Sequence, residues 1–191
     1  MFQVRIHGRG GQGVVSAAEM LSVAAFDEGR YAQAFPSFGS ERMGAPVMAF
    51  CRVDEREIRL REPVLTPDAV IVQDPTLLHQ VDLFHGLSPK GYILINSTRD
   101  FEELGIAEFA RRFPAGHVRT VAASELALEH VGRPRPNAAL LGGFAAITGQ
   151  LRLASVAKAI REKFAGRVGE ANVRAAQAAF AALAATEALH A

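Results

Sequence analysis

Four glycines lie within six residues near the beginning of this chain, at Gly8, Gly10, Gly11 and Gly13. Before them, residues 2–7 alternate apolar and polar side chains as a strand does, and after them apolar residues recur at helical spacing through residues 14–28. Gly29 then marks the end of the expected helix. Glycine tolerates positive φ and has no Cβ, so backbone N–H groups in such a loop can converge on an anion at the positive end of the helix.

The spacing of Gly8, Gly10 and Gly13 is the Gly-x-Gly-x-x-Gly of dinucleotide-binding loops, in the strand-loop-helix setting of such loops. An NAD site also needs an acidic residue about 20 residues farther on, but residues 31–36 contain none. A P-loop is excluded because two valines follow Gly13 where Lys and Ser or Thr are required. The glycines could instead only let the helix and the strand pack closely, and the spacing leaves both interpretations open.

A second informative segment, residues 35–47, is a long irregular connection rich in aromatic, Gly and Pro residues. Connections of this length in compact domains usually serve a function. Together, Gly-Arg-Gly-Gly-Gln-Gly-Val-Val at 8–15 and Phe-Gly-x-Glu-Arg-x-Gly-Ala-Pro-Val at 38–47 resemble the gamma subunit of 2-oxoacid:acceptor oxidoreductases. That family includes the pyruvate, 2-oxoglutarate, branched-chain 2-oxoacid and indolepyruvate ferredoxin oxidoreductases, and the arylglyoxylate dehydrogenase complexes are similar. The resemblance continues through the motifs at 67–74, 91–97 and 136–144.

The resemblance implies a hetero-oligomer in which this chain accompanies alpha, beta and ferredoxin-like delta subunits. Such enzymes oxidatively decarboxylate a 2-oxoacid (pyruvate, another 2-ketoacid or an arylglyoxylate) to acyl-CoA and CO2, and pass electrons to ferredoxin or NAD. The complex is expected to use thiamine diphosphate, Mg and 4Fe-4S clusters, with coenzyme A as co-substrate and FAD or NAD as an option on another subunit. This chain alone is expected to bind no cofactor and to be inactive. The alternatives are a stand-alone dinucleotide-binding dehydrogenase and a non-catalytic assembly module.

The residues of this chain expected to face a cofactor or co-substrate are Gly8, Arg9, Gly10, Gly11, Gln12, Gly13, Glu41 and Arg42. No catalytic residue is predicted, because no Ser-His-Asp or Cys-His arrangement is evident. No metal site is predicted either, because the six His residues lack the i, i+4 spacing of a metal-binding helix.

Each polar candidate has a structural alternative. Gln12 could bind a ligand through its amide or bond its own loop, and Arg9 could hold a phosphate or carboxylate or point into solvent. Glu41 and Arg42 could form an ion pair that shapes the loop, or Arg42 could reach an anion. Met43 stands where the family commonly has a second Arg, which removes an expected salt bridge or anion contact.

Further polar residues follow the later strands. Asp74 comes at the end of a predicted strand, where ligand-facing residues gather in open α/β sheets, but Asp before Pro is also a common turn residue. Residues 96–98 are either a ligand-facing edge or an N-cap. The segment 133–137, Arg-Pro-Arg-Pro-Asn, is a rigid linker or a cationic contact for a phosphorylated ligand or another subunit.

Composition narrows the class of protein. With 191 residues, 49% of them hydrophobic, the chain suffices for one well-packed domain, which we place at 1–191. The formal net charge of +1 gives no reason to expect nucleic acid, and without a signal peptide or membrane segment we expect a cytoplasmic protein. The single Cys51 excludes an internal disulfide and cannot ligate an iron–sulfur cluster alone. We expect it to be a buried structural thiol.

The order of apolar segments predicts a three-layer α/β/α domain with a mostly parallel, mixed, Rossmann-like sheet and an α-rich C-terminal end. Residues 47–53 and 57–60 are predicted to form a hairpin around a tight turn. Strands are expected at 69–73, 92–96 and 117–121, and helices at 76–84, 101–113, 124–128, 137–148, 154–164 and 169–189.

Overall fold

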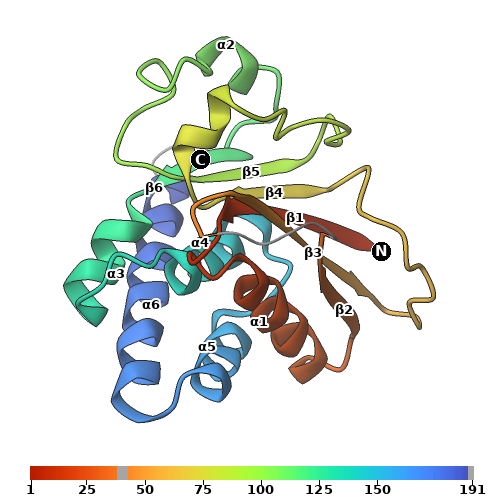
Figure 1. Ribbon diagram of the computed structural model, residues 1–191, viewed down its shortest axis with the longest axis vertical. Coiled ribbons are helices and arrows are strands. Elements are labelled where there is room, and N and C mark those ends of the chain that lie inside the picture. The colour runs from red at the N-terminus through yellow and green to blue at the C-terminus, as the bar shows by residue number, and fades with distance from the viewer. Residues whose placement is uncertain (38–42, 189–191) are drawn as a thin grey trace.

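The computed structural model describes residues 1–37 and 43–188. Its centre is a six-stranded sheet in the order β2-β3-β1-β4-β5-β6 (Figure 1). The central strand β1 runs parallel to β4, as do β5 and β6, whereas β3 lies antiparallel between β1 and β2. The strands are β1 (Phe2–Arg9), β2 (Tyr31–Pro36), β3 (Pro46–Asp54), β4 (Ala69–Val72), β5 (Tyr92–Asn96) and β6 (Val118–Val121).

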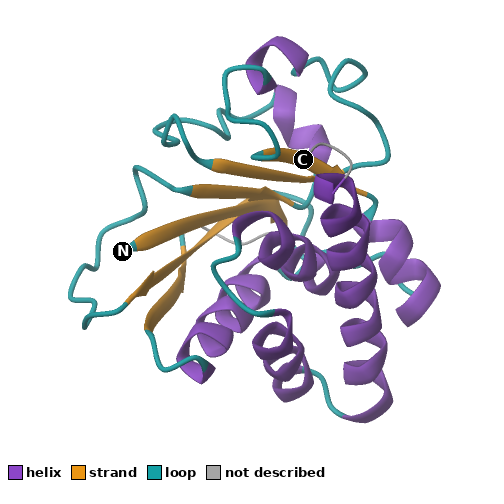
Figure 2. Cartoon of the chain, turned by 180° about the vertical axis from the view of Figure 1, so that it is seen from behind, coloured by secondary structure: helices purple, strands orange, loops and turns teal. Residues whose placement is uncertain are grey.

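The longer helices gather on one face of the sheet (Figure 2). They are α1 (Val14–Asp27), α3 (Ala123–Val131), α4 (Asn137–Thr148), α5 (Leu153–Lys163) and α6 (Gly166–Ala188). The opposite face is covered by the 3-10 helix η1 (Pro75–His79), the short helix α2 (Ala107–Ala110) and the turns around them. The predicted class, an α/β fold with a mixed, mostly parallel sheet and an α-rich C-terminal end, is confirmed.

Side-chain alternation along the strands creates two cores, one on each face. In β4, Ile71 belongs to the helix-side core and Val70 to the core on the opposite face. Helix α4 lies deepest, with ten of its 12 residues buried. It carries Gly142, where a Cβ would lie only 1.9 Å from the carbonyl oxygen of Ala176, so α4 and α6 are in backbone contact there.

Two buried arginines attach loops to the second face of the sheet, which is the face opposite the long helices. Arg5 in β1 donates through Nη2 to the carbonyl oxygens of Leu83 (2.8 Å) and His85 (2.7 Å). Arg52 in β3 is only 2% exposed and donates through Nη2 to the carbonyl oxygen of Glu62 at 2.6 Å. Each guanidinium therefore supplies hydrogen-bond donors to the carbonyl groups of a loop on this face.

The predicted hairpin between residues 47–53 and 57–60 is wrong, because 57–60 form no strand and the antiparallel neighbours of β3 are β1 and β2. After Asp54 the chain instead crosses the second face, where Arg52 binds it. The predicted helix 76–84 shrinks to η1, which ends at the C-cap residue Gln80.

The predicted helix 101–113 is also much shorter than expected, because only Ala107–Ala110 are helical. Gly105 adopts a φ of 70°, which interrupts the helix between Phe101 and Phe109. The apolar residues of this stretch still reach the second core, but they do so from turns.

Candidate functional site

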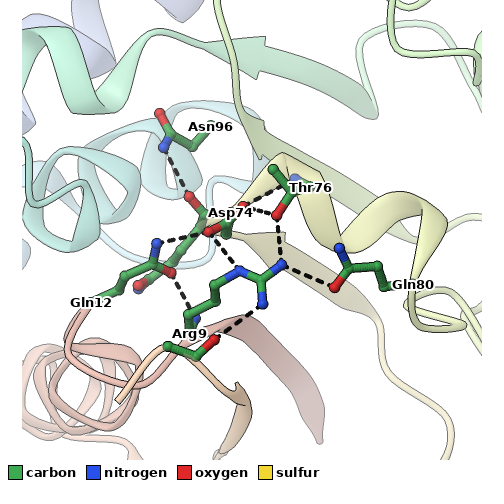
Figure 3. Close-up of polar contacts among 8 residues, drawn as sticks. Arg9, Gln12, Asp74, Thr76, Gln80 and Asn96 are labelled. Atoms are coloured by element: carbon green, nitrogen blue, oxygen red, sulfur yellow. Dashed lines mark hydrogen bonds and ion pairs between the residues drawn. The ribbon is translucent and has the colours of Figure 1, made fainter.

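The glycine loop lies where β1 and β4 end side by side, on the carboxyl edge of the sheet (Figure 1). The chain leaves β1 toward α1 on one side of this point, and the strands after β4 extend to the other side. Such a switch point is where open α/β sheets commonly bind ligands. In this chain the position is occupied by a cluster of its own side chains (Figure 3).

Arg9, the last residue of β1, is at the centre of this cluster. Its Nε donates to Oδ2 of Asp74 at 3.1 Å, and its Nη1 donates to the carbonyl oxygen of Gly44 at 3.1 Å. Its Nη2 donates to Oγ1 of Thr76 at 2.8 Å and to Oε1 of Gln80 at 3.0 Å. One guanidinium thus connects β1 to the segment before β3 and to η1.

Asp74 is the main acceptor and also caps η1. Its Oδ1 accepts from the backbone N (3.0 Å) and from Oγ1 (2.6 Å) of Thr76, and its Oδ2 accepts from Nε2 of Gln12 at 3.0 Å as well as from Arg9. Burial opposes ionisation of this carboxyl group, but these hydrogen bonds and the charge of Arg9 prevail, so its pKa lies below its ordinary value. Asp74 is therefore a charged structural partner, in line with its interpretation as a turn residue.

Gln12 uses both ends of its amide within the protein. Its Oε1 accepts from the backbone N of Arg9 at 2.6 Å, while its Nε2 donates to Asp74. The loop-internal alternative for Gln12 therefore describes the observed contacts, and Arg9 points to a carboxylate of its own chain. A ligand-binding role for either residue stays a prediction.

The glycines are placed by close packing and by backbone conformation. A Cβ on Gly8 would lie 2.6 Å from Cγ2 of Val14, and one on Gly13 would lie 2.6 Å from Nδ2 of Asn137. Gly13 has a φ of 77° and Gly11 a φ of 91°, a region that side chains rarely adopt. Close packing thus accounts for Gly8 and Gly13 without a ligand.

The segment before β3 meets the glycine loop directly. The backbone N of Gly10 donates to the carbonyl oxygen of Ala45 at 2.9 Å, and the backbone N of Gly44 donates back to Gly10 at 3.2 Å. Met43 forms a bridge with Gly10, yet its side chain is 87% exposed. The candidates Glu41 and Arg42 lie outside the described residues.

Asn96 forms a second polar connection on the same edge. Its Nδ2 donates to the carbonyl oxygen of Gln73 (2.8 Å) and to Oγ of Ser124 (2.8 Å), and its Oδ1 accepts from the backbone N of Ser124 at 3.0 Å. Asn96 thus caps the first turn of α3 from a neighbouring strand. A shallow cavity of about 310 Å³ lies beside it, lined by residues that include Ser97 and Thr98. The linker arginines Arg133 and Arg135 are exposed.

Thr76, Gln80 and Ser124 were not predicted as members of this edge. Thr76 follows an Asp-Pro pair, which is a local signal for a capped turn. Gln80 and Ser124 have no comparable signal, because their contacts depend on which strands are neighbours.

The described residues do not fit an iron–sulfur cluster or a metal ion. Within residues 1–37 and 43–188, no three His, Cys, Asp or Glu side chains are grouped so that they could hold a metal. Cys51 is buried, and burial raises the pKa of its thiol to about 12. An iron–sulfur cluster needs several thiolates, and the chain has one cysteine. In the described part of the chain, no helix has the length and apolarity to cross a membrane.

This chain is similar to known proteins over nearly its whole length. Residues 3–182 match the family model "Pyruvate ferredoxin/flavodoxin oxidoreductase". The "Pyruvate/ketoisovalerate oxidoreductases common subunit gamma" of Thermococcus kodakarensis is 47% identical over 180 residues, 94% of this chain and 96% of that protein. The "Pyruvate synthase subunit PorC" of Methanothermobacter thermautotrophicus is 46% identical and covers 94% of each chain.

A solved structure of a subunit with a similar name has the same fold as this chain. The crystal structure of pyruvate oxidoreductase subunit PORC from Thermotoga maritima has a TM-score of 0.79 and 37% identity, over 94% of this chain and 95% of that one. The fold and its glycine loop therefore define a gamma-type subunit of 2-oxoacid oxidoreductases. The chain belongs to the pyruvate ferredoxin/flavodoxin oxidoreductase family, as the two sequence motifs predicted.

Proposed function

We propose that this chain assembles with alpha, beta and delta subunits into a thiamine-diphosphate-dependent enzyme that converts pyruvate or a branched-chain 2-oxoacid to acyl-CoA and CO2, with ferredoxin as electron acceptor. The observation that carries the proposal is identity of 46–47% to gamma and PorC subunits, over 94% of this chain and 94–96% of theirs. The names of these relatives mention neither arylglyoxylate nor NAD, so we propose neither arylglyoxylate as substrate nor NAD as electron acceptor.

In this assembly the chain serves as a companion subunit. The name of the Thermococcus relative describes a gamma subunit common to a pyruvate and a ketoisovalerate oxidoreductase. A subunit shared by two enzymes is unsuited to choosing between their substrates, so selection of the 2-oxoacid falls to the other chains. The iron–sulfur clusters are likewise assigned to them, since this chain has a single, buried cysteine. Thiamine diphosphate with its magnesium ion is also assigned to them, because the described residues hold no group of His, Cys, Asp or Glu that could bind a metal.

The carboxyl edge is the proposed contact with the catalytic subunits or with coenzyme A. Two segments distant in sequence, the glycine loop and residues 43–45, are held together there by the hydrogen bonds of Gly10 and Arg9. Met43 presents an exposed thioether on this edge, and methionine adapts readily to apolar partner surfaces. The cluster around Arg9 fixes the shape of the edge before a partner arrives.

The test is co-expression of the four subunits with wild-type or Gly10→Val gamma chain. Mass, iron, bound thiamine diphosphate and CoA-dependent reduction of a viologen dye by each 2-oxoacid are then measured. Valine at Gly10 adds a branched side chain where the glycine loop is hydrogen-bonded to Gly44 and Ala45, and this should impair assembly or turnover. The matched control is Gly149→Asn. Gly149 ends α4 in the left-handed backbone region, which asparagine tolerates, and an added Cβ would have nothing within 4 Å.

Full activity of a correctly folded Gly10→Val complex would contradict the role of the loop. Failure of the wild-type chain to join an iron-containing, 2-oxoacid-oxidising complex would contradict the proposed function itself. Tight binding of NAD or FAD to the isolated chain would instead favour the dinucleotide-binding alternative.

A further inference from the structure

The two edges of the sheet differ in how they are protected against pairing with another strand. Strand β6 is short, with four residues, and carries the charged Arg119. Strand β2 has six residues, Tyr-Ala-Gln-Ala-Phe-Pro, without a single charge. It is hydrogen-bonded to β3 on one side and is the outermost strand of the sheet (Figures 1 and 2).

Proteins commonly protect exposed edges with charged residues, proline, bulges or very short strands, because unpaired N–H and C=O groups attract other strands. Of these devices β2 has only Pro36, at its last position, so residues 31–35 remain able to pair. An uncharged edge of this length is expected to be covered by another chain.

Apolar side chains flank the beginning of this edge on both faces of the sheet. Phe26, near the end of α1, is 76% exposed, and Tyr31, the first residue of β2, is 51% exposed. The tight turn at Gly29 connects them. Ala32 and Ala34 point to the helix-side core, so alternation places Tyr31 on the opposite face.

The charges near the turn are already neutralised within the chain. Asp27 is paired with Lys158, and Arg30 is paired with Glu55 at 3.0 Å. No unbalanced charge from these groups would therefore repel an identical surface.

We propose that two copies of this chain associate through β2, in antiparallel and two-fold symmetric pairing centred on Gln33, to form one continuous sheet. The sequence of the strand favours a second copy as the occupant, because its side chains are arranged symmetrically about Gln33: an alanine stands on each side of Gln33 and an aromatic residue beyond each alanine. It places Tyr31 opposite Phe35 of the second copy on one face, and Ala32 opposite Ala34 on the other. Aromatic cross-strand pairs stabilise antiparallel sheets, and a two-fold axis makes each contact twice.

The test uses the full chain, alone and within the assembled oxidoreductase, with light scattering and chemical cross-linking. Two wild-type gamma chains should be found together in both cases. Tyr31→Lys should raise the dimer dissociation constant by about tenfold or more, because a lysine would be placed against an apolar partner. Leu128→Lys on α3 is the matched control, since Leu128 is 53% exposed and remote from the edge.

A cysteine scan tests the register. Directly opposite residues in antiparallel strands have Cα atoms about 4.5–5.5 Å apart, which a disulfide can span. Gln33→Cys should therefore form an intermolecular disulfide on oxidation. Tyr31→Cys should not, because in this register the two copies of residue 31 are about 14 Å apart. The native Cys51 is buried and does not interfere.

Wild-type chains that remain monomeric alone and occur singly in the assembled enzyme would overturn the proposal. A dimer that is insensitive to Tyr31→Lys, or that forms no disulfide in Gln33→Cys, would also overturn it, because association would then use another surface. Urea unfolding of each variant distinguishes loss of association from loss of folding. The outcomes for the isolated chain do not depend on the proposed enzymatic function, whereas those for the assembled oxidoreductase do.

Discussion

Breaking the ion pair between Arg9 and Asp74 should measurably destabilise the fold. The perturbation is a double-mutant cycle made of Arg9→Ala, Asp74→Ala and the double variant. The two side chains are 23% and 14% exposed and are joined at 3.1 Å. They are thus less solvated than an ordinary surface pair, so their coupling should exceed the value of about 0.2–1 kcal/mol typical of exposed pairs.

The magnitude follows from the bonds that Asp74 accepts. Its cap on the backbone N of Thr76 is worth about 1 kcal/mol, and a charge-assisted bond to Arg9 adds about 1.5–3 kcal/mol. Because both groups keep some contact with water, we take the lower end of that range. Asp74→Ala should therefore cost about 2.5 kcal/mol in total, with about 1.5 kcal/mol of coupling to Arg9.

The assay is urea unfolding of the four proteins, with the free energy of unfolding compared at constant m-value. The matched control is the same cycle on Arg59 and Glu57, which are 2.9 Å apart but 84% and 62% exposed. If the coupling of Arg9 with Asp74 is no larger than that of this control pair, the Arg9 cluster does not hold the glycine loop.

The dependence of folding stability on pH in the acid range offers an independent check on the role of the Asp74 carboxylate. The pKa of Asp74 is lowered in the folded protein, so its contribution is present above its unfolded pKa of about 3.9 and is lost as pH falls through the lower folded value. Asp74→Asn should remove this loss from a plot of stability against pH. An unchanged dependence of stability on pH in the acid range would contradict the assignment.

Three further predictions concern the interior. Burial, assisted by the charge of Arg5, lowers the pKa of His7 to about 3. Below about pH 6.5 the unfolded chain therefore binds a proton on His7 that the folded protein does not bind. The free energy of unfolding should fall by about 1.4 kcal/mol per pH unit from about pH 6.5 downward. His7→Gln should flatten that slope in urea titrations followed by circular dichroism. Gly142→Ala should destabilise by about 3 kcal/mol because its Cβ meets backbone, whereas Gly143→Ala, which meets only leucine side chains, should stay within about 1 kcal/mol of wild type in thermal unfolding. The Cys51 thiol, with its pKa raised to about 12, should not react with a thiol reagent until the chain is unfolded, and rapid reaction of the native protein would refute its burial.

Patterns confined to one element predicted the fold well. Alternation before Gly8 and helical spacing after Gly13 located β1 and α1, and Gly29 marked the end of the helix, because each signal lies within the element that it describes. The helix expected at 101–113 failed because its apolar residues are buried from turns around Gly105. An apolar spacing alone does not distinguish those two ways of burying side chains.

The cluster at the carboxyl edge was harder to predict than the fold. Arg9 and Asp74 are 65 residues apart, and they meet only because β4, rather than β2, lies beside β1 on that side. The sequence offers a guanidinium and a carboxylate, each with several possible partners. Strand order decides between them, and strand order comes from the packing of the whole chain.

The depth of α4 has a consequence for synthesis of the protein. Helix α4 fills the space between the sheet and α6, and it begins only at Asn137. Until the ribosome has released residues up to α6, the six strands have only α1 and α3 on that face and lack α4, α5 and α6. The nascent chain therefore cannot complete its core during most of its translation, and folding, together with any joining of partner subunits, must wait for the final quarter of the polypeptide.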